Sequence, residues 1–425
     1  MVVENYRPRI IDRTVKTYLS AFGAVCIEGP KWCGKTWTSR HHSNSEILIG
    51  SPEGNFQNRR LAELSPELVL EGDTPRLIDE WQDVTSLWDA VRYEVDNRDM
   101  KGQFILTGSS TPRHKGIMHS GAGRIARLRM HPMSLYESGV SSGEVSLSDL
   151  CNGIFQPKMT GDVKLQTLAE CIIRGGWPGN QDNDISTAKL ITEEYIKATI
   201  EDDVQRIDGI TRDRNKVRLL LRSLARNEST TVSNKTLKND IKEIDDEDVD
   251  AKTISSYLDI FNRLFLTENQ KPFASNVRSS IRVKQSEKRH FVDPSLACSL
   301  LQMNTERLIG DLNTFGFLFE SLVERDLNIY AQSFGGKLYH YQDYSNKEVD
   351  AVIELDNGDW CAFEIKLGAN QIDAAAEGLI KLQKAIIEED NGRPPKILCV
   401  ICGLSNAAYK RPDGVFVVPV TALKD

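Results

Sequence analysis

The sequence predicts an α/β protein built from several domains, and three observations support this prediction. Residues 24–41 read as an apolar strand, a glycine-framed loop and the first turns of a helix. Strand-like and helical segments then alternate as far as about residue 140, which is typical of a parallel sheet covered by helices. Residues 348–367 read as a hairpin that belongs to a second sheet. A length of 425 residues allows roughly two to four domains.

The composition is ordinary for a globular chain, with 40% hydrophobic and 7% aromatic residues. The net charge of −8 does not indicate a nucleic-acid-binding protein as a whole, although a local basic face could lie within this acidic total. Residues 1–20 lack the apolar core of a signal peptide, and no apolar segment approaches the length of a membrane span. We therefore expect a cytoplasmic protein with no membrane partner.

The loop after the first strand matches the phosphate-binding pattern G-x-x-x-x-G-K-[ST]. Glycines at its two ends let backbone N–H groups close on phosphate oxygens, and the following helix adds the positive end of its dipole. Lys35 is then expected to reach the β- and γ-phosphates, and the Thr36 hydroxyl to ligate Mg²⁺, so ATP and Mg²⁺ are the expected ligands. A glycine loop with a surface lysine is the alternative. The expected nucleotide contacts are Gly29, Pro30, Lys31, Trp32, Cys33, Gly34, Lys35, Thr36 and Trp37.

A helix is expected over residues 5–23, and further strands over residues 46–50 and 75–80. The last of these strands ends in two carboxylates, Asp79 and Glu80. Asp79 is expected to hold the metal, and Glu80 to act as the general base that polarises the attacking water. An extra strand between the phosphate-loop strand and this one, together with the adjacent glutamate, is typical of additional-strand ATPases rather than kinases or GTPases. The alternative is an ordinary acidic turn.

Two further strands are expected to carry polar residues towards the same site. The strand over residues 103–110 ends in Thr107, Ser109 and Ser110, any of which could hydrogen-bond the γ-phosphate or the attacking water, and we select Ser109. An ordinary strand-to-loop turn is the alternative. The next strand carries Arg124, Arg127 and Arg129, one of which could stabilise the transferring charge. For any single arginine, a solvated strand face is the alternative.

The segments GPKWCGKT, LIDEWQ, FILTGSS and GAGRIARLRMHPMSLYE occur in that order. Together they resemble the N-terminal ATPase domain of a prokaryotic AAA+-like family (AAA_14 type), whose members carry a C-terminal domain named DUF4143. The resemblance covers about residues 15–140 and implies a phosphate-sensing role for Arg124. The loop RGGWPG at residues 174–179 resembles the glycine-rich start of the companion domain.

The middle of the chain reads as a linker and helical region over residues 141–214, followed by helices and a basic segment over residues 215–305. Two of these helices are separated by an acidic loop near residues 243–249. Three helices and a basic ribbon outline a winged helix-turn-helix, and the family resemblance implies the same. Such a module could place its third helix on DNA, or it could serve only to pack against protein. The candidate phosphate contacts are Lys252, Arg278, Arg282, Lys284, Lys288 and Arg289.

Residues 306–425 read as an α/β domain that contains a helix at 315–325 and the hairpin strands 348–355 and 360–367. Because the side-chain period of a strand is two, Glu364 and Lys366 share one face, and Asp350 on the partner strand lies within reach of Glu364. Two carboxylates and a lysine can hold Mg²⁺ and position a water against a phosphodiester. A cross-strand charge cluster on a solvated face is the alternative.

This hairpin resembles the restriction-endonuclease-like (PD-(D/E)xK) core. The resemblance implies that Asp350 and Glu364 are metal ligands, that Lys366 orients the water, and that Glu320 is the acid of the first helix. Lys381 and Gln383 are weaker candidates on the following helix. Further on, Cys399 and Cys402 have C-x-x-C spacing but read as core positions of a buried strand, and the eight cysteines are expected to be reduced.

The sequence therefore predicts a P-loop ATPase domain (1–140), a linker and helical region (141–214), a winged helix (215–305) and a restriction-endonuclease-like domain (306–425). The expected function is Mg²⁺-dependent ATP binding and hydrolysis, coupled to a nuclease-like domain that acts on or binds nucleic acid. The alternative is a non-catalytic nucleotide switch or scaffold whose C-terminal domain binds DNA or a protein without cleavage. A protein partner, a homo-oligomer and nuclease activity itself are left open.

Overall fold

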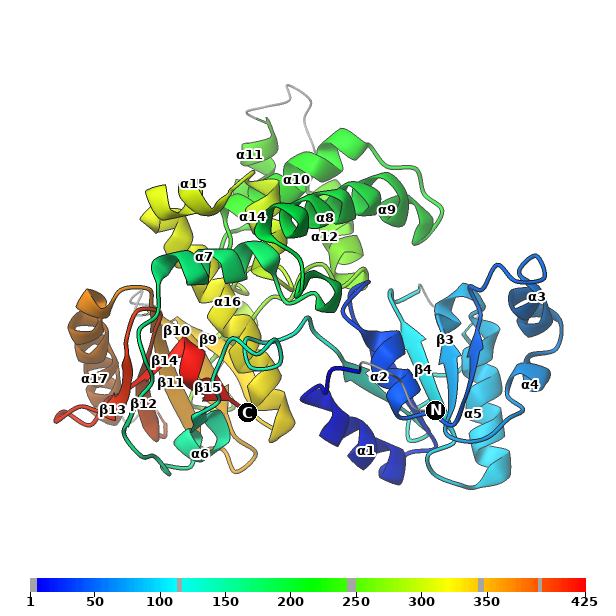
Figure 1. Ribbon diagram of the computed structural model, residues 1–425, viewed down its shortest axis with the longest axis horizontal. Coiled ribbons are helices and arrows are strands. Elements are labelled where there is room, and N and C mark those ends of the chain that lie inside the picture. Colours follow the sequence, from blue (N-terminus) through cyan, green and yellow to red (C-terminus); the bar gives the residue numbers. More distant parts are fainter. Residues whose placement is uncertain (1–5, 113–116, 243–249, 343–347, 389–391) are drawn as a thin grey trace. The chain divides into compact units, whose positions relative to one another are not determined.

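The structure is a computed structural model that describes residues 6–112, 117–242, 250–342, 348–388 and 392–425 (Figure 1). The chain divides into two compact units. Unit 1 comprises Met1–Pro132, Glu201–Arg212 and Asp259–Leu266, and unit 2 comprises Met133–Ile200, Asp213–Leu258 and Thr267–Asp425. Among the helices that the structure describes, none combines the length and apolar character needed to span a membrane.

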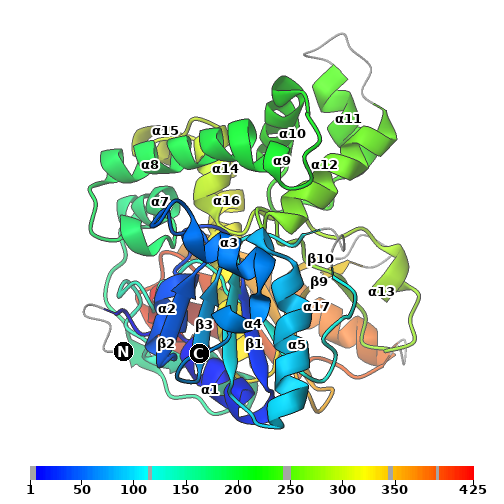
Figure 2. The ribbon, with the colours of Figure 1, turned by 90° about the vertical axis from the view of Figure 1, so that its right-hand side faces the viewer.

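Unit 1 is built on a five-stranded, all-parallel sheet in the order β2-β3-β4-β1-β5 (Figure 2). Its strands are β1 Ala24–Glu28, β2 Ser45–Leu48, β3 Arg76–Asp79, β4 Phe104–Gly108 and β5 Ile125–Arg129. Its helices include α1 Ile11–Ala21, α2 Lys35–His41, α3 Gln57–Leu64, α4 Pro66–Val69, α5 Ser86–Arg98 and α9 Val204–Arg206. Continuous apolar strands such as β1, which is buried along its whole length, are typical of a sheet covered on both faces.

The core of unit 1 shows why α5 forms and where it packs. Leu87, Val91 and Val95 lie on one face of this helix and are all buried, as their spacing predicts. They pack with Trp88 of the same helix and with Phe104 and other strand residues in one hydrophobic cluster. This packing fixes the strands and therefore the edge at which the loops emerge.

The sequence analysis expected the extra strand over residues 46–50, but the strand order places β4 between β1 and β3. The strand that lies between them in the chain, β2, instead pairs only with β3 at the edge of the sheet. In the register of the sheet, Glu28 lies level with Gly108 and with Arg129. The carboxyl ends of β1, β3 and β4 therefore meet at one edge, where ligands of open parallel sheets bind.

Unit 2 contains an eight-stranded mixed sheet in the order β7-β13-β14-β12-β11-β10-β9-β8. Strands β9, β10 and β11 are antiparallel neighbours, whereas β11, β12 and β14 run parallel. The strands are β7 Lys158–Met159, β8 Pro272–Phe273, β9 Lys337–Gln342, β10 Glu348–Glu354, β11 Trp360–Lys366, β12 Ile397–Cys402, β13 Ala407–Lys410 and β14 Phe416–Pro419. Cys399 and Cys402 are buried in β12, as expected of core positions.

Two helices pack on this sheet, α16 (Leu312–Ser333) and α17 (Ile372–Glu388). The buried residues of α17, which include Ile372, Ala376 and Leu379, follow the three-to-four spacing of one helix face and join the sheet core. Helix α16 is buried along most of its length. Its buried residues include the charged side chains of Glu324, Arg325 and Asp326. Buried charges require partners, and those of Glu324 are described below.

The described residues of unit 2 also form further helices and three isolated β-bridges. These helices are α6 Leu147–Cys151, α7 Leu165–Arg174, α8 Ile185–Ala198, α10 Arg214–Arg226, α11 Asn234–Lys242, α13 Ile281–Lys284, α14 Pro294–Leu300 and α15 Thr305–Gly310, and α12 (Ala251–Arg263) crosses from unit 2 into unit 1 along the chain. A further parallel pair joins β6 (Val145–Ser146) to β15 (Leu423–Lys424). The bridges pair Thr230 with Arg289, Thr267 with Phe291 and Gln270 with Lys288. The acidic loop predicted near residues 243–249 lies outside the described residues.

Candidate functional site

The phosphate-loop residues 29–34 join β1 to α2. The geometry of the loop explains why glycine occupies both motif positions, 29 and 34. A Cβ added at Gly29 would lie 2.2 Å from the carbonyl oxygen of Met130, so no larger residue fits without a backbone shift. Gly34 has φ 103°, a conformation that side chains rarely adopt. Lys35 begins α2, and its buried ammonium donates to the Pro30 carbonyl oxygen at 2.8 Å. Lys35 therefore lies over the loop whose amides would face a phosphate.

Thr36 and Asp79, predicted to share a metal, lie in direct contact. The Thr36 Oγ1 donates to Asp79 Oδ1 at 2.9 Å, and Thr107 Oγ1 donates to the same oxygen at 2.6 Å. Burial raises the pKa of the Asp79 carboxyl, while the two hydroxyl donors oppose that shift. A hydroxyl and a carboxylate are the oxygen ligands that Mg²⁺ prefers, so these residues fit the expected metal.

Glu80 and Ser109 are also brought together at this edge. The Ser109 Oγ donates to Glu80 Oε2 at 2.7 Å, and the Gln82 amide donates to the same carboxylate oxygen. The backbone N–H of Glu80, which has φ 58°, donates to Thr107 Oγ1 at 2.9 Å. Sequence reasoning missed Gln82, although its position on the turn just after the acidic strand end was the available signal.

The outer part of the loop has contacts that the sequence analysis also missed. Lys31 forms an ion pair with Asp203 at 2.6 Å, and Trp32 and Trp37 are 38% and 50% exposed. The carbonyl oxygen of the buried Cys33 accepts from Arg9 at 2.8 Å, and Arg9 also donates to His131 O at 2.9 Å. Arg9 braces the loop from a segment that carries no motif, so only the folded structure identifies it.

The structure does not bring Arg124 to this edge within unit 1. Strand β5 runs parallel to β1, with Ala24 level with Ile125, so Arg124 lies at the amino end of the sheet. There its Nε donates to Asp96 Oδ1 at 2.8 Å. The arginines nearer the carboxyl edge have other contacts, because Arg127 pairs with Glu28 and Arg129 lies over the Phe265 ring. The register explains the difference, since sequence alone does not give the direction of a strand.

In unit 2, the β10–β11 hairpin brings Asp350, Glu364 and Lys366 together, as period two predicts. The Lys366 Nζ lies 2.9 Å from Asp350 Oδ2 and 2.6 Å from Glu364 Oε2. Burial, followed by the neighbouring Asp350 charge, raises the pKa of Glu364 to about 7. Burial lowers the pKa of Lys366, but the two carboxylates outweigh it and hold that pKa above its usual value.

Glu320 on α16 lies beside this hairpin, and its partner is Lys288. The Lys288 Nζ contacts the Glu320 carboxylate, lies 3.0 Å from Glu324 Oε1 and donates to the Asp350 carbonyl oxygen at 3.2 Å. The Lys288 side chain is only 1% exposed. The other oxygen of Glu324, Oε2, lies 2.9 Å from His290 Nε2. Lys288, expected as a phosphate contact on the surface, is therefore buried instead, because α16 offers it two carboxylates.

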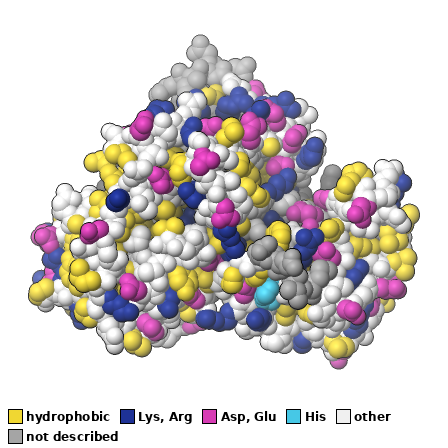
Figure 3. All heavy atoms as spheres, viewed as in Figure 1, with side chains coloured by type: hydrophobic (Ala, Val, Ile, Leu, Met, Phe, Trp, Pro, Cys, Tyr) yellow, Lys and Arg dark blue, Asp and Glu magenta, His cyan; other side chains and the backbone are white. Residues whose placement is uncertain are grey.

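The other basic residues expected at a DNA surface divide into two groups. Arg282 forms an ion pair with Glu354 at 2.7 Å, and Arg289 donates to Asn234 at 2.8 Å, so both have partners within unit 2. The exposed members of the set are Lys252, Arg278 and Lys284. On the face shown in Figure 3, the Lys and Arg side chains are interspersed with Asp and Glu rather than gathered into one continuous field.

The two weaker candidates on α17 have ordinary structural partners. Lys381 pairs with Glu377 one turn earlier at 2.7 Å, and Gln383 donates to the Pro395 carbonyl oxygen at 3.1 Å. Lys381 is largely exposed. Neither contact involves the hairpin carboxylates.

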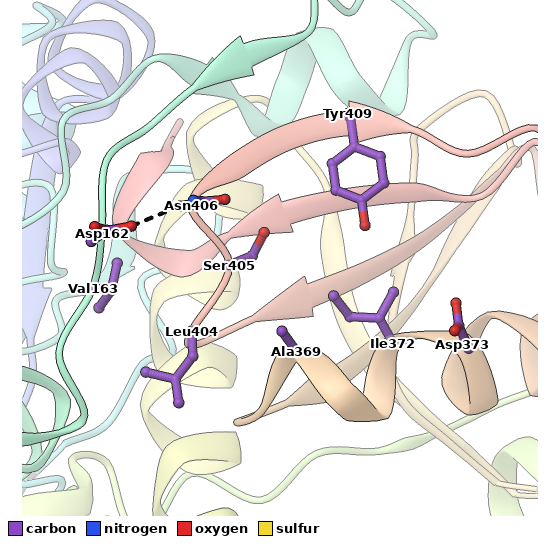
Figure 4. A pocket seen from close by; sticks show the side chains of 9 residues that line it. All are labelled: Asp162, Val163, Ala369, Ile372, Asp373, Leu404, Ser405, Asn406 and Tyr409. Carbon is purple, nitrogen blue, oxygen red and sulfur yellow. Dashed lines mark hydrogen bonds between the residues drawn. The ribbon is translucent and has the colours of Figure 1, made fainter.

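An open hollow of about 530 Å³ lies next to the start of α17 (Figure 4). Tyr409 from β13 and Ile372 and Asp373 from α17 face it, and Asp162 accepts from Asn406 on its rim at 3.4 Å. Asp373 is paired with Arg411. We assign no ligand to this hollow.

Comparison with known families identifies three segments of the chain. Residues 21–139 match the model of the AAA domain (AAA_14). The N-terminal part of the chain is an ATPase-like P-loop domain. Residues 315–423 match a domain of unknown function, DUF4143, and residues 165–307 match another, DUF8612. The chain thus combines a segment similar to the AAA domain with a C-terminal segment similar to DUF4143, as the sequence resemblance implied.

Two curated relatives and one solved structure extend this comparison. The chain is 24% identical over 355 residues to an uncharacterized protein of Mycobacterium bovis and equally to one of Mycobacterium tuberculosis, and each match covers 80% of this chain and 70% of the relative. A Walker-type ATPase of Pyrococcus abyssi matches with 15% identity and a TM-score of 0.44, over 70% of this chain and 97% of that chain.

Proposed function

We propose that this protein binds MgATP at the loop of residues 29–36 and hydrolyses it. The observation that carries the proposal is the pair of contacts at the carboxyl edge of the sheet, Thr36 with Asp79 and Ser109 with Glu80. The first pair provides oxygen ligands for a magnesium ion next to the phosphate loop. The second holds a carboxylate beside them, where it can polarise a water.

In this proposal each residue has a separate task. Lys35 leaves the Pro30 carbonyl oxygen and binds the β- and γ-phosphates, and backbone amides of the loop surround the same oxygens. Magnesium, when bound with the nucleotide, neutralises charge that develops on the phosphates. Glu80 accepts a proton from the attacking water, and Ser109 fixes the position of that carboxylate.

The test is steady-state ATPase activity together with nucleotide affinity. Lys35→Ala is expected to weaken ATP binding and to lower kcat by about 10²–10³-fold, as expected for loss of one charge-stabilising donor. Glu80→Gln is expected to retain ATP binding and lose about 10²–10⁴-fold in kcat, because it removes a general base. Glu63→Gln, an exposed carboxylate on α3, is the matched control and keeps wild-type values. Full activity in Glu80→Gln contradicts the assignment of the base.

We further propose that the phosphate loop communicates with the rest of the chain through Asp203. Asp203 ends a π-helical segment, Thr199–Asp203, that continues α8 along the chain. A nucleotide that attracts Lys31 competes with the 2.6 Å ion pair to Asp203. The nucleotide state is then transmitted along the backbone of this segment.

For the C-terminal region we propose a restriction-endonuclease-like fold. The order of elements α16, β9, β10, β11, α17 and β12, with antiparallel β9–β11 followed by parallel β12, supports it. Asp350, Glu364 and Lys366 form the acidic site of this region and act on or bind nucleic acid. An assay of DNA and RNA cleavage with Mg²⁺ or Mn²⁺ is the test, with Lys366→Ala as the inactive variant.

A second candidate function for this region is nucleic-acid or protein binding without cleavage. It is favoured by the internal pairing of the site, because both hairpin carboxylates already hold the Lys366 ammonium. This candidate predicts that neither the wild type nor Lys366→Ala cuts DNA or RNA under any of these metal conditions. Cleavage by the wild type alone excludes it.

We also propose that residues 215–305 form a winged helix and that the domain boundaries lie at about residues 140, 214 and 305. Helices α10, α11 and α12, followed by bridges that link residues 230, 267 and 270 with 288–291, support it. The exposed Lys252 and Lys284 are the proposed phosphate contacts. The double variant Lys252→Ala/Lys284→Ala is then expected to weaken DNA binding uniformly across sequences and to reduce the salt dependence of the affinity.

A further inference from the structure

The carboxylates of Glu320 and Glu324 on α16 are neutralised by a side chain of the protein, the Lys288 ammonium. Lys288 is brought there by the bridge between Gln270 and Lys288, in which each backbone N–H donates to the other residue's carbonyl oxygen at 2.9 Å. Its ammonium then lies among three oxygen acceptors, from Glu320, Glu324 and the Asp350 backbone. An ammonium has three donors, so these contacts use its full hydrogen-bonding capacity.

The same three oxygens would suit a small divalent cation. Two carboxylates and one backbone carbonyl are hard oxygen ligands of the kind that bind Mg²⁺, Mn²⁺ or Ca²⁺. However, a buried ammonium and a divalent cation cannot occupy one place, and like charges repel strongly in a buried site. The residues on the α16 side therefore do not fit a metal ion while Lys288 is present.

We propose that Lys288 is the resident cation of the α16 side of this site and takes the place of a divalent ion there. Any divalent ion is then restricted to the hairpin carboxylates Asp350 and Glu364, because the Lys366 side chain that pairs with them is 26% exposed and can move into solvent, whereas Lys288 is 1% exposed. Glu320 is thus a ligand of Lys288 and not of a metal. This inference rests on the acidic site proposed above, but it does not depend on ATP hydrolysis at Lys35.

The local surroundings explain why the lysine remains in place. Glu324 is shared between Lys288 and His290, and His290 in turn lies 3.4 Å from Glu228. These side chains are all buried, so removal of one charge leaves its partners unpaired in a low-dielectric environment. Exchange of Lys288 for a free ion is therefore costly, and the ammonium stays bound at any ordinary concentration of divalent salt.

Mn²⁺ binding to the full-length, nucleotide-free protein tests the proposal, by electron paramagnetic resonance and by calorimetry. Lys288→Met replaces the lysine by an unbranched, uncharged side chain that is one atom shorter, so the variant is expected to bind one Mn²⁺ per chain more than the wild type. Lys235→Met, at an exposed lysine on α11, is the matched control and adds none. A Lys288→Met protein that is folded but has the wild-type Mn²⁺ stoichiometry overturns the proposal.

A second variant keeps the proposal testable if Lys288→Met does not fold. Glu320→Gln retains a hydrogen-bond acceptor for Lys288 and is expected to leave wild-type Mn²⁺ affinity unchanged. If Glu320 were a metal ligand instead, this variant would weaken binding by at least about 10- to 100-fold, the loss found even for supporting residues of metal sites. Glu364→Gln tests the hairpin site separately. A weaker Mn²⁺ affinity in this variant supports the acidic site, and this result does not depend on the role of Lys288. An unchanged affinity in Glu364→Gln counts against that site, not against Lys288.

Discussion

Thr107→Val isolates the hydroxyl that connects the two carboxylates of the ATPase-like site. Thr107 is fully buried, and its Oγ1 donates to Asp79 at 2.6 Å while it accepts from the Glu80 N–H at 2.9 Å. Valine has nearly the same shape, so the substitution opens no cavity. It removes a hydrogen bond to a charged group, which contributes about 1.5–3 kcal/mol, and leaves a backbone N–H without its partner at a cost of about 1–3 kcal/mol.

The free energy of unfolding of unit 1 is therefore expected to fall by about 3 kcal/mol or more. With a urea m-value of about 2–3 kcal/mol/M, the midpoint moves down by about 1 M. Tryptophan fluorescence follows the transition, since Trp81 and Trp88 are buried in the same unit. The pKa of Asp79, which burial already raises, is expected to rise further because one of the donors that oppose that shift is lost.

Thr107→Ser is the matched control, because it keeps the hydroxyl and removes one methyl group. Loss of that methyl costs about 1 kcal/mol. The valine variant should therefore unfold at clearly lower urea than the serine variant. If the two midpoints coincide, or if valine is the more stable, the hydroxyl does not organise this edge as described.

Three further expectations concern packing, pH and the phosphate loop. Leu379→Ala in α17 should lower the free energy of unfolding of unit 2 by about 2–5 kcal/mol, whereas the exposed Ile387→Ala should change it little, as urea titration would show. Because the folded-state pKa of Glu364 is raised to about 7, its contribution to stability is present below the usual pKa and is lost as pH rises to about 7. Thermal melts of Glu364→Gln should therefore show a flatter pH dependence than the wild type over that range, and an identical profile would contradict this. Gly29→Ala should abolish ATP binding, since its new Cβ would lie 2.2 Å from a backbone oxygen, while Gly50→Ala meets nothing within 4 Å and should bind ATP normally in the same calorimetric assay.

The sequence pattern was sufficient to locate site residues that lie within one segment or one hairpin. The glycines and Lys35 follow one another along the chain, so the motif alone located them and the structure shows them framing a single loop. Period two was enough to bring Glu364 and Lys366 to one face of β11. In both places the geometry depends on backbone conformation over a few residues, which the sequence determines directly.

The sequence did not predict which residues far apart in the chain come into contact. The sequence analysis considered Thr107 but selected Ser109, and only the register of β3 and β4 shows that Thr107 joins Asp79 to Glu80. The position of Arg124 required the direction of β5 relative to β1. Lys288 looked like a solvated charge because its two carboxylate partners lie more than thirty residues away on α16.

The ATPase-like unit is discontinuous along the chain, and this has a consequence for its synthesis. Segments Glu201–Arg212 and Asp259–Leu266 belong to unit 1, although long stretches of unit 2 precede each of them. A ribosome that has released only the first 132 residues has therefore not yet made Asp203, the partner of Lys31, or Phe265, which lies against Arg129. The nascent N-terminal part lacks these two contacts until residue 266 has emerged. A fragment that ends with β5 would contain all five strands of the sheet but would lack both of these contacts.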